Sequence, residues 1–283
     1  MKKNSQNNGT KIVLLGTGTP NTDPLRSGPC VAVIVNGQPY IFDLGPGMVR
    51  RAAEAHQAGI AALENSKLTR AFLTHLHSDH TAGYPDFLMT PWVLGREEPI
   101  QVHGPEGTKV MTDHLVSAFQ QDIDQRIHGL EKKTTASFRV NVEEIDSDWI
   151  YQDDNVQVEA FPVRHGDWQA FGFRIISADR IIVISGDTAP NENISDFAKN
   201  CDVLIHEVYS IAGFKTRPDQ WQFYHSNYHT SSYELAELAL KTQPGLLVLY
   251  HQLFWGFSEE SLLNEIHEKY SGKVHSGKDL DVI

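Results

Sequence analysis

Short apolar runs, each bounded by Gly, Pro, Asn or Asp, recur along this chain. They are KIVLLG, VAVIV, PYIFDLG, AFLT, IQVHG, VQVEAFPV, FGFRII, RIIVISGD, DVLIHEV and LLVLYH. Runs of this length and composition are typical of strands. Helical patterns lie between them at residues 48–57, 108–127, 232–241 and 258–270, and Ser residues suited to N-capping open the last two. The alternation predicts an α/β fold in which helices cover sheets.

The chain has 283 residues, of which 40% are hydrophobic, enough for a substantial core. It shows no linker rich in Pro, Gly or Ser and no repeat. We therefore expect a polar tail over residues 1–10 and a single domain over residues 11–283. No apolar run is long enough to cross a membrane, and no apolar segment follows the N-terminal Met-Lys-Lys-Asn. We expect no membrane partner and a cytoplasmic location, or a periplasmic or secreted one if a signal peptide was removed.

The formal net charge of −12, with a pI near 5.6, makes a long polyanion an unfavourable partner unless a local basic patch exists. A small anionic substrate is easier to reconcile with this charge than a nucleic acid. The only cysteines, Cys30 and Cys201, are far apart in sequence. They suggest neither a disulfide framework nor a cysteine-based zinc site.

The heptapeptide THLHSDH at residues 74–80 concentrates three imidazoles and a carboxylate directly after the strand-like run Ala-Phe-Leu. In an extended segment alternate side chains share a face, so His75, His77 and Asp79 converge while His80 turns toward an adjacent point. Nitrogen and oxygen ligands without thiolates suit zinc best, with iron or manganese as alternatives. The spacing therefore predicts a site for two metals side by side.

This heptapeptide resembles the signature of the metallo-β-lactamase superfamily, and further family motifs follow in the expected order: VRHG at 163–166, SGDT at 185–188 and YH at 250–251. The resemblance implies an αββα sandwich, with two mixed β-sheets flanked by helices. It also implies two divalent metal ions, Zn²⁺ first and Mn²⁺ or Fe as alternatives. The resemblance implies that His75, His77 and His165 bind one ion and that Asp79, His80 and His251 bind the other. It implies that Asp187 bridges the two ions.

Two motifs of the second half resemble the ribonuclease Z branch of that superfamily: VLIHE at 203–207 and HTSSYELA at 229–236. The resemblance implies that Glu207 orients His229, which then protonates the leaving group. Asp79 is expected to accept a proton as well as to bind metal. Other stretches are similar to arylsulfatase-like hydrolases of the same branch, namely GTGTPNTDPLRSGPCVAVIVNGQPYIFDLGPG, HSDHTAGYPDFLMTPW and HEVYS.

Three further residues are candidates for supporting roles. Asp43 lies in one of the arylsulfatase-like stretches and is expected to support the metal-binding loop. Trp168 and Tyr209 are neighbours of proposed site residues and are expected to line a substrate pocket.

Long-form ribonuclease Z enzymes carry a tRNA-gripping arm between the positions that match His165 and Asp187. Here that segment is GDWQAFGFRIISADRIIVISG, whose pattern of strand, turn and strand leaves no room for an arm. With the acidic charge, this favours a ribonuclease Z-like hydrolase without the arm. It would cleave a phosphodiester or sulfate ester of a small anionic substrate, by attack of hydroxide generated at the metals.

Other functions remain open. They are a tRNA 3′-processing endoribonuclease, a thioester or lactone hydrolase of the glyoxalase II or lactonase type, a flavodiiron-like electron carrier and a non-catalytic binding protein. The intact His77 disfavours the electron carrier, because that branch commonly has Glu at this position. Relatives in the ribonuclease Z branch are often dimers, which makes a homodimer a further expectation.

Overall fold

The computed structural model describes residues 9–283, so most of the expected N-terminal tail lies outside the described residues. The described chain divides into two compact units. The first comprises residues 9–16, 27–145 and 280–283, and the second comprises residues 17–26 and 146–279. Both ends of the described chain thus belong to the first unit, where Ile12 and Ile283 exchange two backbone hydrogen bonds of 3.0 and 2.9 Å. The single domain expected over residues 11–283 stays a prediction.

The first unit is built on a six-stranded sheet in the order β1-β2-β3-β4-β5-β6. Pairing is antiparallel from β1 to β3 and parallel from β3 to β6, so the sheet is mixed. β2 is buried along its whole length, as expected for a central apolar run. The strands are β1 (Lys11–Gly16), β2 (Cys30–Val35), β3 (Gln38–Phe42), β4 (Arg70–Phe72), β5 (Ile100–Gly104) and β6 (Val140–Glu144).

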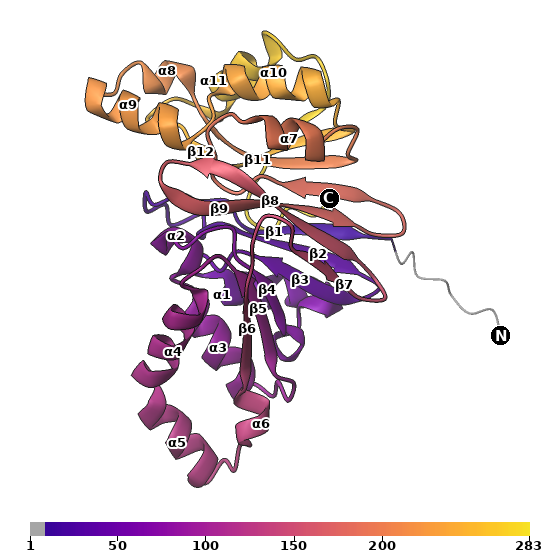
Figure 1. Cartoon of the computed structure of the whole chain (residues 1–283), viewed down its shortest axis with the longest axis vertical. Coiled ribbons are helices and arrows are strands. Elements are labelled where there is room, and N and C mark those ends of the chain that lie inside the picture. Colours follow the sequence, from indigo (N-terminus) through magenta and orange to yellow (C-terminus); the bar gives the residue numbers. More distant parts are fainter. Residues whose placement is uncertain (1–8) are drawn as a thin grey trace, which may run out of the picture. The chain divides into compact units, whose positions relative to one another are not determined.

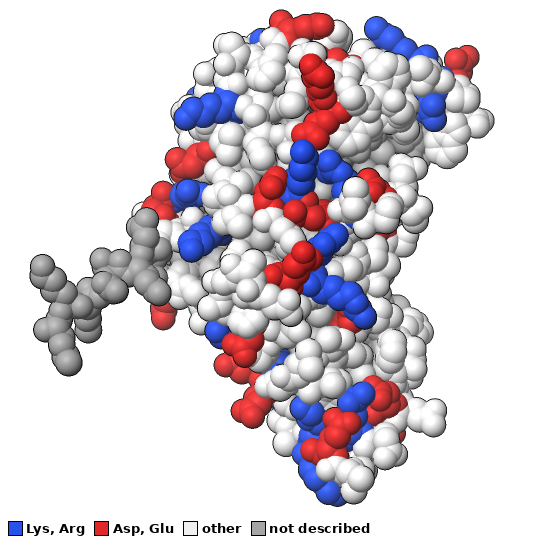
Figure 2. Space-filling model, turned by 180° about the vertical axis from the view of Figure 1, so that it is seen from behind, with Lys and Arg blue, Asp and Glu red and all other residues white. Residues whose placement is uncertain are grey.

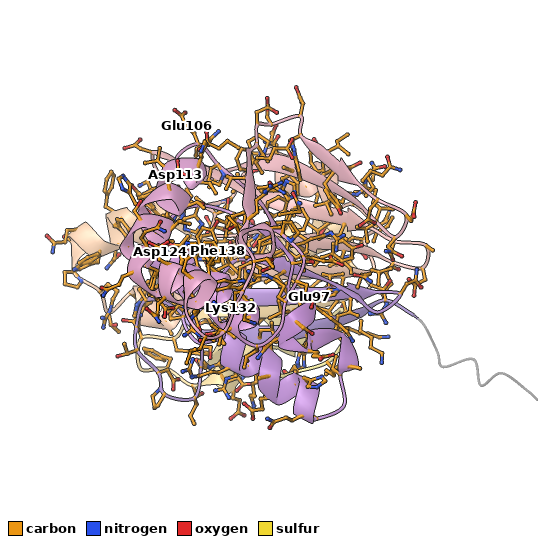
Figure 3. All side chains as sticks on the ribbon, turned by 90° about the horizontal axis from the view of Figure 1, so that it is seen from below. Glu97, Glu106, Asp113, Asp124, Lys132 and Phe138 are labelled. Carbon is orange, nitrogen blue, oxygen red and sulfur yellow. The ribbon has the colours of Figure 1, made fainter. Side chains whose placement is uncertain are left out.

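Helices of this unit include α1 (Met48–Gln57) and α3 (Tyr84–Val93), which bury Met48, Phe87 and Trp92 in the core. Figure 1 shows α4 (Thr108–Ala118), α5 (Gln120–His128) and α6 (Thr135–Phe138) together beyond the sheet. Figure 3 shows this part of the chain from below, with Asp113, Asp124 and Phe138 labelled. The single helix predicted over residues 108–127 is therefore wrong. The chain leaves helical geometry at Phe119, whose φ is −99° and ψ 8°. The remaining helical segments are α2 (Ser78–Thr81) and the 3₁₀ turns η1 (Ala61–Leu63) and η2 (Asn65–Lys67).

The second unit contains a seven-stranded sheet in the order β13-β12-β11-β10-β9-β8-β7. Strands β7 to β10 pair antiparallel and β10 to β13 pair parallel, so this sheet is mixed as well. The strands are β7 (Ile150–Gln152), β8 (Gln157–His165), β9 (Trp168–Ile176), β10 (Ile181–Ile184), β11 (Val203–Tyr209), β12 (Leu246–Leu253) and β13 (Val274–Ser276).

Helices α7 (Glu192–Phe197), α10 (Ser232–Thr242) and α11 (Glu259–His267) cover one face of the second sheet (Figure 1), where Ile194, Leu235 and Leu262 join one buried cluster with strand residues. Ser258 caps α11, as predicted, by accepting a hydrogen bond from the Ser261 amide. The cap of α10 is Ser231 rather than Ser232. Its hydroxyl and the Glu234 carboxylate form a capping box.

Two further helices of this unit, α8 (Ile211–Phe214) and α9 (Asp219–Tyr228), lie in the segment between β11 and α10. α9 contributes no buried residue, which explains why no apolar periodicity revealed it in the sequence. Among the described residues, no helix combines the length and the apolar character that crossing a membrane requires.

Candidate metal centre and proton-transfer pair

In the first unit, the His-rich heptapeptide links β4 to α2. His75 and His77 belong to the irregular link, whereas Asp79 and His80 lie within α2. The prediction of one extended segment is therefore wrong beyond His77, because the chain turns into a helix at Ser78. The side chains still approach in pairs: His75 Nε2 lies 3.0 Å from His77 Nδ1, and His80 Nε2 lies 3.6 Å from Asp79 Oδ2.

Asp43 connects this link to the end of β3. Its buried carboxylate accepts hydrogen bonds from the Thr74 amide at 2.8 Å and from His80 Nδ1 at 2.8 Å. The Thr74 hydroxyl also donates to Asp43, at 2.9 Å, and accepts from His75 Nδ1 at 2.9 Å. These bonds fix the Nδ1–H tautomers, which leaves each Nε2 as the acceptor suited to a metal. The geometry suits the supporting role expected of Asp43, which stays a prediction.

In the second unit, His165, Asp187 and His251 are all buried and come from three different strands or strand ends. His165 is the last residue of β8, and its Nδ1 donates to the carbonyl of Tyr228 at 2.8 Å. Nε2 therefore faces away from the Tyr228 carbonyl and is left as an acceptor. Asp187 follows β10, and its Oδ2 lies 3.4 Å from His251 Nε2. One ligand atom each of His165, Asp187 and His229 lie within 4.8 Å of one another.

The apolar run LLVLYH ends at His251, but β12 continues to Leu253, so His251 lies inside the strand. Glu207 of β11 pairs with Tyr250 and the next residue, Val208, pairs with Gln252, so His251 is the extra residue of a β-bulge. Its φ of 45° is in the left-handed region, which costs an L-residue about 1–2 kcal/mol. A bulge re-aims the side chain of the extra residue, and here the imidazole is directed at Asp187.

Glu207 and His229 form a buried pair beside this cluster. Glu207 Oε2 lies 3.4 Å from His229 Nδ1, and Oε1 accepts from the Thr230 amide at 2.7 Å and the Thr188 amide at 3.4 Å. Burial and the nearby Asp187 carboxylate raise the pKa of Glu207, and the charge of His251 and the two amides partly offset this. A cation near Asp187 would lower the pKa again and keep Glu207 ionised.

The residues of both units fit divalent metals. Glu207, His229 and His251 form a second group whose ligand atoms lie within 4.8 Å of one another, so two carboxylates and three imidazoles are buried together in the second unit. Buried carboxylates are unfavourable without a compensating cation. Imidazole nitrogens and carboxylate oxygens suit zinc. Cys201 is no competing ligand, since burial raises the pKa of its thiol to about 12.

The turn after His165 offers a test of how the position of this candidate ligand is maintained. Gly166 has φ 56°, and a Cβ there would lie 2.0 Å from the Tyr228 ring. Gly166→Ala should therefore lower the free energy of unfolding by about 1–3 kcal/mol from overpacking, in addition to backbone strain. Urea unfolding followed by circular dichroism would measure this. Gly37→Ala is the matched control, with φ 79° and open space around its Cβ; equal losses in the two variants would contradict the steric explanation.

The two residues expected in a substrate pocket differ in exposure. Trp168 begins β9 and is 43% exposed, whereas Tyr209 is 3% exposed and stacks on Phe214 with centroids 4.9 Å apart. Their role in a pocket stays a prediction. The sequence reasoning missed His225, which precedes His229 by one helical turn with ring centroids 5.5 Å apart. The spacing of the two histidines in HSNYH is the signal that would have found it.

Comparison with known proteins agrees with this geometry. Residues 39–252 match the family described as Beta-lactamase superfamily domain. A Ribonuclease Z of Mycobacterium sp. (strain KMS) is 35% identical over 246 residues, which cover 86% of this chain and 84% of the relative.

Solved structures agree on the fold. The metallo-β-lactamase fold protein YhfI from Bacillus subtilis matches with a TM-score of 0.74 at 17% identity, covering 97% of this chain and 99% of that one. The short form of human tRNase Z matches with a TM-score of 0.70 at 22% identity, covering 96% and 98%.

The fold and the buried His/Asp clusters define a hydrolase of the metallo-β-lactamase type, with two mixed sheets flanked by helices as predicted. Within this class, the chain belongs to the metallo-β-lactamase superfamily as a ribonuclease Z-like member.

Proposed function

We propose that this protein is a metal-dependent phosphodiesterase whose first substrate to test is a precursor tRNA. The observation that carries the proposal is the Glu207–His229 pair, buried beside Asp187 and His251. A thioester releases a thiolate, which departs without a proton, so a thioester hydrolase would not need this pair. The alkoxide leaving group of an RNA phosphodiester does need a proton. The name of the mycobacterial relative, Ribonuclease Z, supports the same substrate class.

We propose that seven His and Asp ligands hold two divalent ions, Zn²⁺ first. One ion would take His75, His77 and His165, the other would take Asp79, His80 and His251, and Asp187 would be shared. When bound, two such ions lower the pKa of water and neutralise charge that develops on the phosphoryl oxygens. The carboxylate of Asp79 is the proposed acceptor of a proton from the attacking water.

The proton for the departing oxygen comes from His229. Glu207 Oε2 lies 3.4 Å from His229 Nδ1. A carboxylate on this side of the ring favours the proton on Nδ1 and raises the basicity of Nε2, so that Nε2 can carry and deliver the proton. The amides of Thr188 and Thr230 hold the other Glu207 oxygen and prevent the carboxylate from turning away. Attack and departure are thereby assisted by different residues, Asp79 and His229.

A second candidate is the hydrolysis of a small phosphodiester or sulfate ester. It is favoured by the tight link between β8 and β9, where His165 pairs directly with Trp168, and by the net charge of −12. Figure 2 shows Lys and Arg interspersed with Asp and Glu over one face of the described chain, rather than a broad basic patch. A long RNA would therefore depend on local contacts for binding.

One parallel assay separates these candidates. Metal-loaded protein would be given a precursor tRNA, bis(p-nitrophenyl) phosphate, an aryl sulfate and a thioester, and kcat/KM would be compared. The proposal expects cleavage of both phosphodiesters, with the tRNA cut at one position near its 3′ end. Cleavage of the small diester alone would favour the second candidate. Preference for the thioester or the sulfate would overturn the phosphodiesterase assignment.

Replacing Asp43 tests its proposed effect on the metal ligands. Asp43→Asn keeps the shape but weakens the hydrogen bonds from Thr74 and His80. We expect metal affinity to fall by about 10–100-fold, as is typical when a partner behind a ligand is removed. Competition with a chromogenic chelator would measure the affinity. Unchanged affinity would restrict Asp43 to a structural role. The matched control is Asp113→Asn on α4, which is exposed.

The expected homodimer and cytoplasmic location stay predictions. Size-exclusion chromatography with light scattering would establish the oligomeric state.

A further inference from the structure

We infer that three rings beside His229 form a stacking platform for a nucleobase of the leaving group, an inference that rests on the proposed phosphodiesterase function. We call Trp221, His225 and Trp255 the aromatic shelf. All three belong to the second unit, with Trp221 and His225 on α9 and Trp255 just after β12.

The shelf is continuous and adjoins the proposed proton donor. The His225 ring centroid lies 4.6 Å from that of Trp255, 6.0 Å from that of Trp221 and 5.5 Å from that of His229. A group stacked on these rings would therefore lie close to the nitrogen that protonates the leaving oxygen. This proximity assigns the shelf to the leaving-group side of the reaction.

The rings are accessible to a ligand. Trp221 is 47% exposed, and His225 and Trp255 are half-buried. If these two indoles were part of a hydrophobic core, they would be fully buried, as Trp92 is in the first unit. The Trp255 ring contacts that of Tyr209, with centroids 5.7 Å apart, and this contact supports its position.

Trp255 is held in an unfavourable backbone conformation. Its φ of 47° lies in the left-handed region, where a bulky residue is an outlier. Such conformations persist when the surrounding structure enforces them, and they cluster at ligand-binding sites. A glycine follows at position 256, also with positive φ. The strained backbone thus lies at one of the two residues that contribute an indole to the shelf.

The chemistry around the shelf suits a base better than a plain hydrocarbon ring. Arg217 places its guanidinium 6.0 Å from the Trp255 ring centroid, and the buried His225 Nδ1 has no hydrogen-bond partner among the described residues. Burial, followed by the charge of His229, lowers the pKa of His225 to about 4, so its imidazole is neutral near pH 7.

A cavity of about 270 Å³ begins at Trp255, and its walls include Asn21, Asp23 and Arg26. These side chains can form hydrogen bonds with the edge of a base. Stacking on the shelf would not by itself distinguish one base from another.

The experiment uses an RNA substrate of the metal-loaded protein. Product analysis first identifies the nucleotide that carries the leaving oxygen, and that nucleotide is then made abasic, which leaves the sugar hydroxyl and its pKa nearly unchanged. One lost stacking contact corresponds to about 5- to 150-fold in binding. We therefore expect the abasic substrate to have a KM higher by a factor in this range, with a smaller change in kcat.

Trp255→Leu and Trp221→Leu should reduce the KM ratio of abasic to natural substrate toward one. Phe223→Leu is the matched control, because Phe223 lies on the same helix and is 74% exposed but makes no ring contact with the shelf among the described residues. A wild-type ratio near one, or an equal loss of the ratio in Phe223→Leu, would overturn the inference while leaving the phosphodiesterase proposal intact.

A binding measurement makes the inference independent of turnover. Adenosine 5′-monophosphate should quench the tryptophan fluorescence of the wild type, ribose 5-phosphate should not, and Trp255→Leu should weaken nucleotide binding about 5-fold or more. If no phosphodiester is cleaved but this pattern appears, the proposed function fails and the base site stands. Equal binding of the two phosphates would refute the base site.

Discussion

Replacement of His75 by alanine is expected to remove bound metal and hydrolysis together. His75 is fully buried, its Nδ1 donates to Thr74 and its Nε2 lies 3.0 Å from His77 Nδ1. No neighbouring group can replace this nitrogen without moving the link between β4 and α2. Loss of a direct ligand should lower activity by more than the roughly 10–100-fold that loss of an outer partner costs. Metal content by mass spectrometry and kcat/KM would be measured on the same preparation.

The control for His75→Ala is His114→Ala, because His114 is an exposed histidine on α4. It should keep both metal and activity. Chelator treatment of the wild type should reproduce the loss, and added Zn²⁺ should restore it in the wild type alone. A His75→Ala protein that retains two metals per chain at full activity would contradict the ligand assignment.

Replacement of His229 by alanine is expected to leave metal content unchanged and to slow turnover. A general acid contributes about 10²–10⁴-fold to a rate. The loss should therefore be of this size for alkoxide leaving groups and much smaller for p-nitrophenoxide, which departs without a proton. The measurement is kcat for a series of phosphodiesters, plotted against the pKa of the leaving group. The slope should be steeper for the variant than for the wild type.

Glu207→Gln extends this test to the orienting residue. Gln keeps an acceptor near His229 but loses the charge, so its activity should fall between those of wild type and His229→Ala. A loss of the same size for every leaving group would argue that His229 acts on metal binding or folding and not as a proton donor. Metal analysis of both variants distinguishes these explanations.

The sequence predicted most of the core strands, because their apolar runs are buried, as in β2 and β11. It predicted α1 at its observed bounds, since Val49, Ala52 and Ala55 repeat with helical spacing on the buried side. It missed β6, whose residues are mostly exposed, and α9, which buries none. Elements without an apolar stripe have no signal in the periodicity.

The sequence was sufficient to predict which residues and motifs belong to the candidate site, but not the local backbone geometry that positions them. The β-bulge at His251 depends on how β12 pairs with β11, and no local pattern in LLVLYH specifies it. The contacts of Asp43 with Thr74 and His80 join segments that are distant in sequence. The turn into α2 after His77 could have been suspected from Ser78 and Asp79, which favour helix starts. The roles of all these residues stay predictions until the variants are measured.

The extra residue in β12 implies a conflict for anyone who engineers this protein for heat resistance. Shortening the strand by one residue would make its ladder with β11 regular, and a method that rewards sheet regularity would favour that deletion. The same deletion would remove the imidazole directed at Asp187. Thermostability screens should therefore exclude this position, and natural relatives that tolerate high temperature are expected to gain their robustness elsewhere in the sheet.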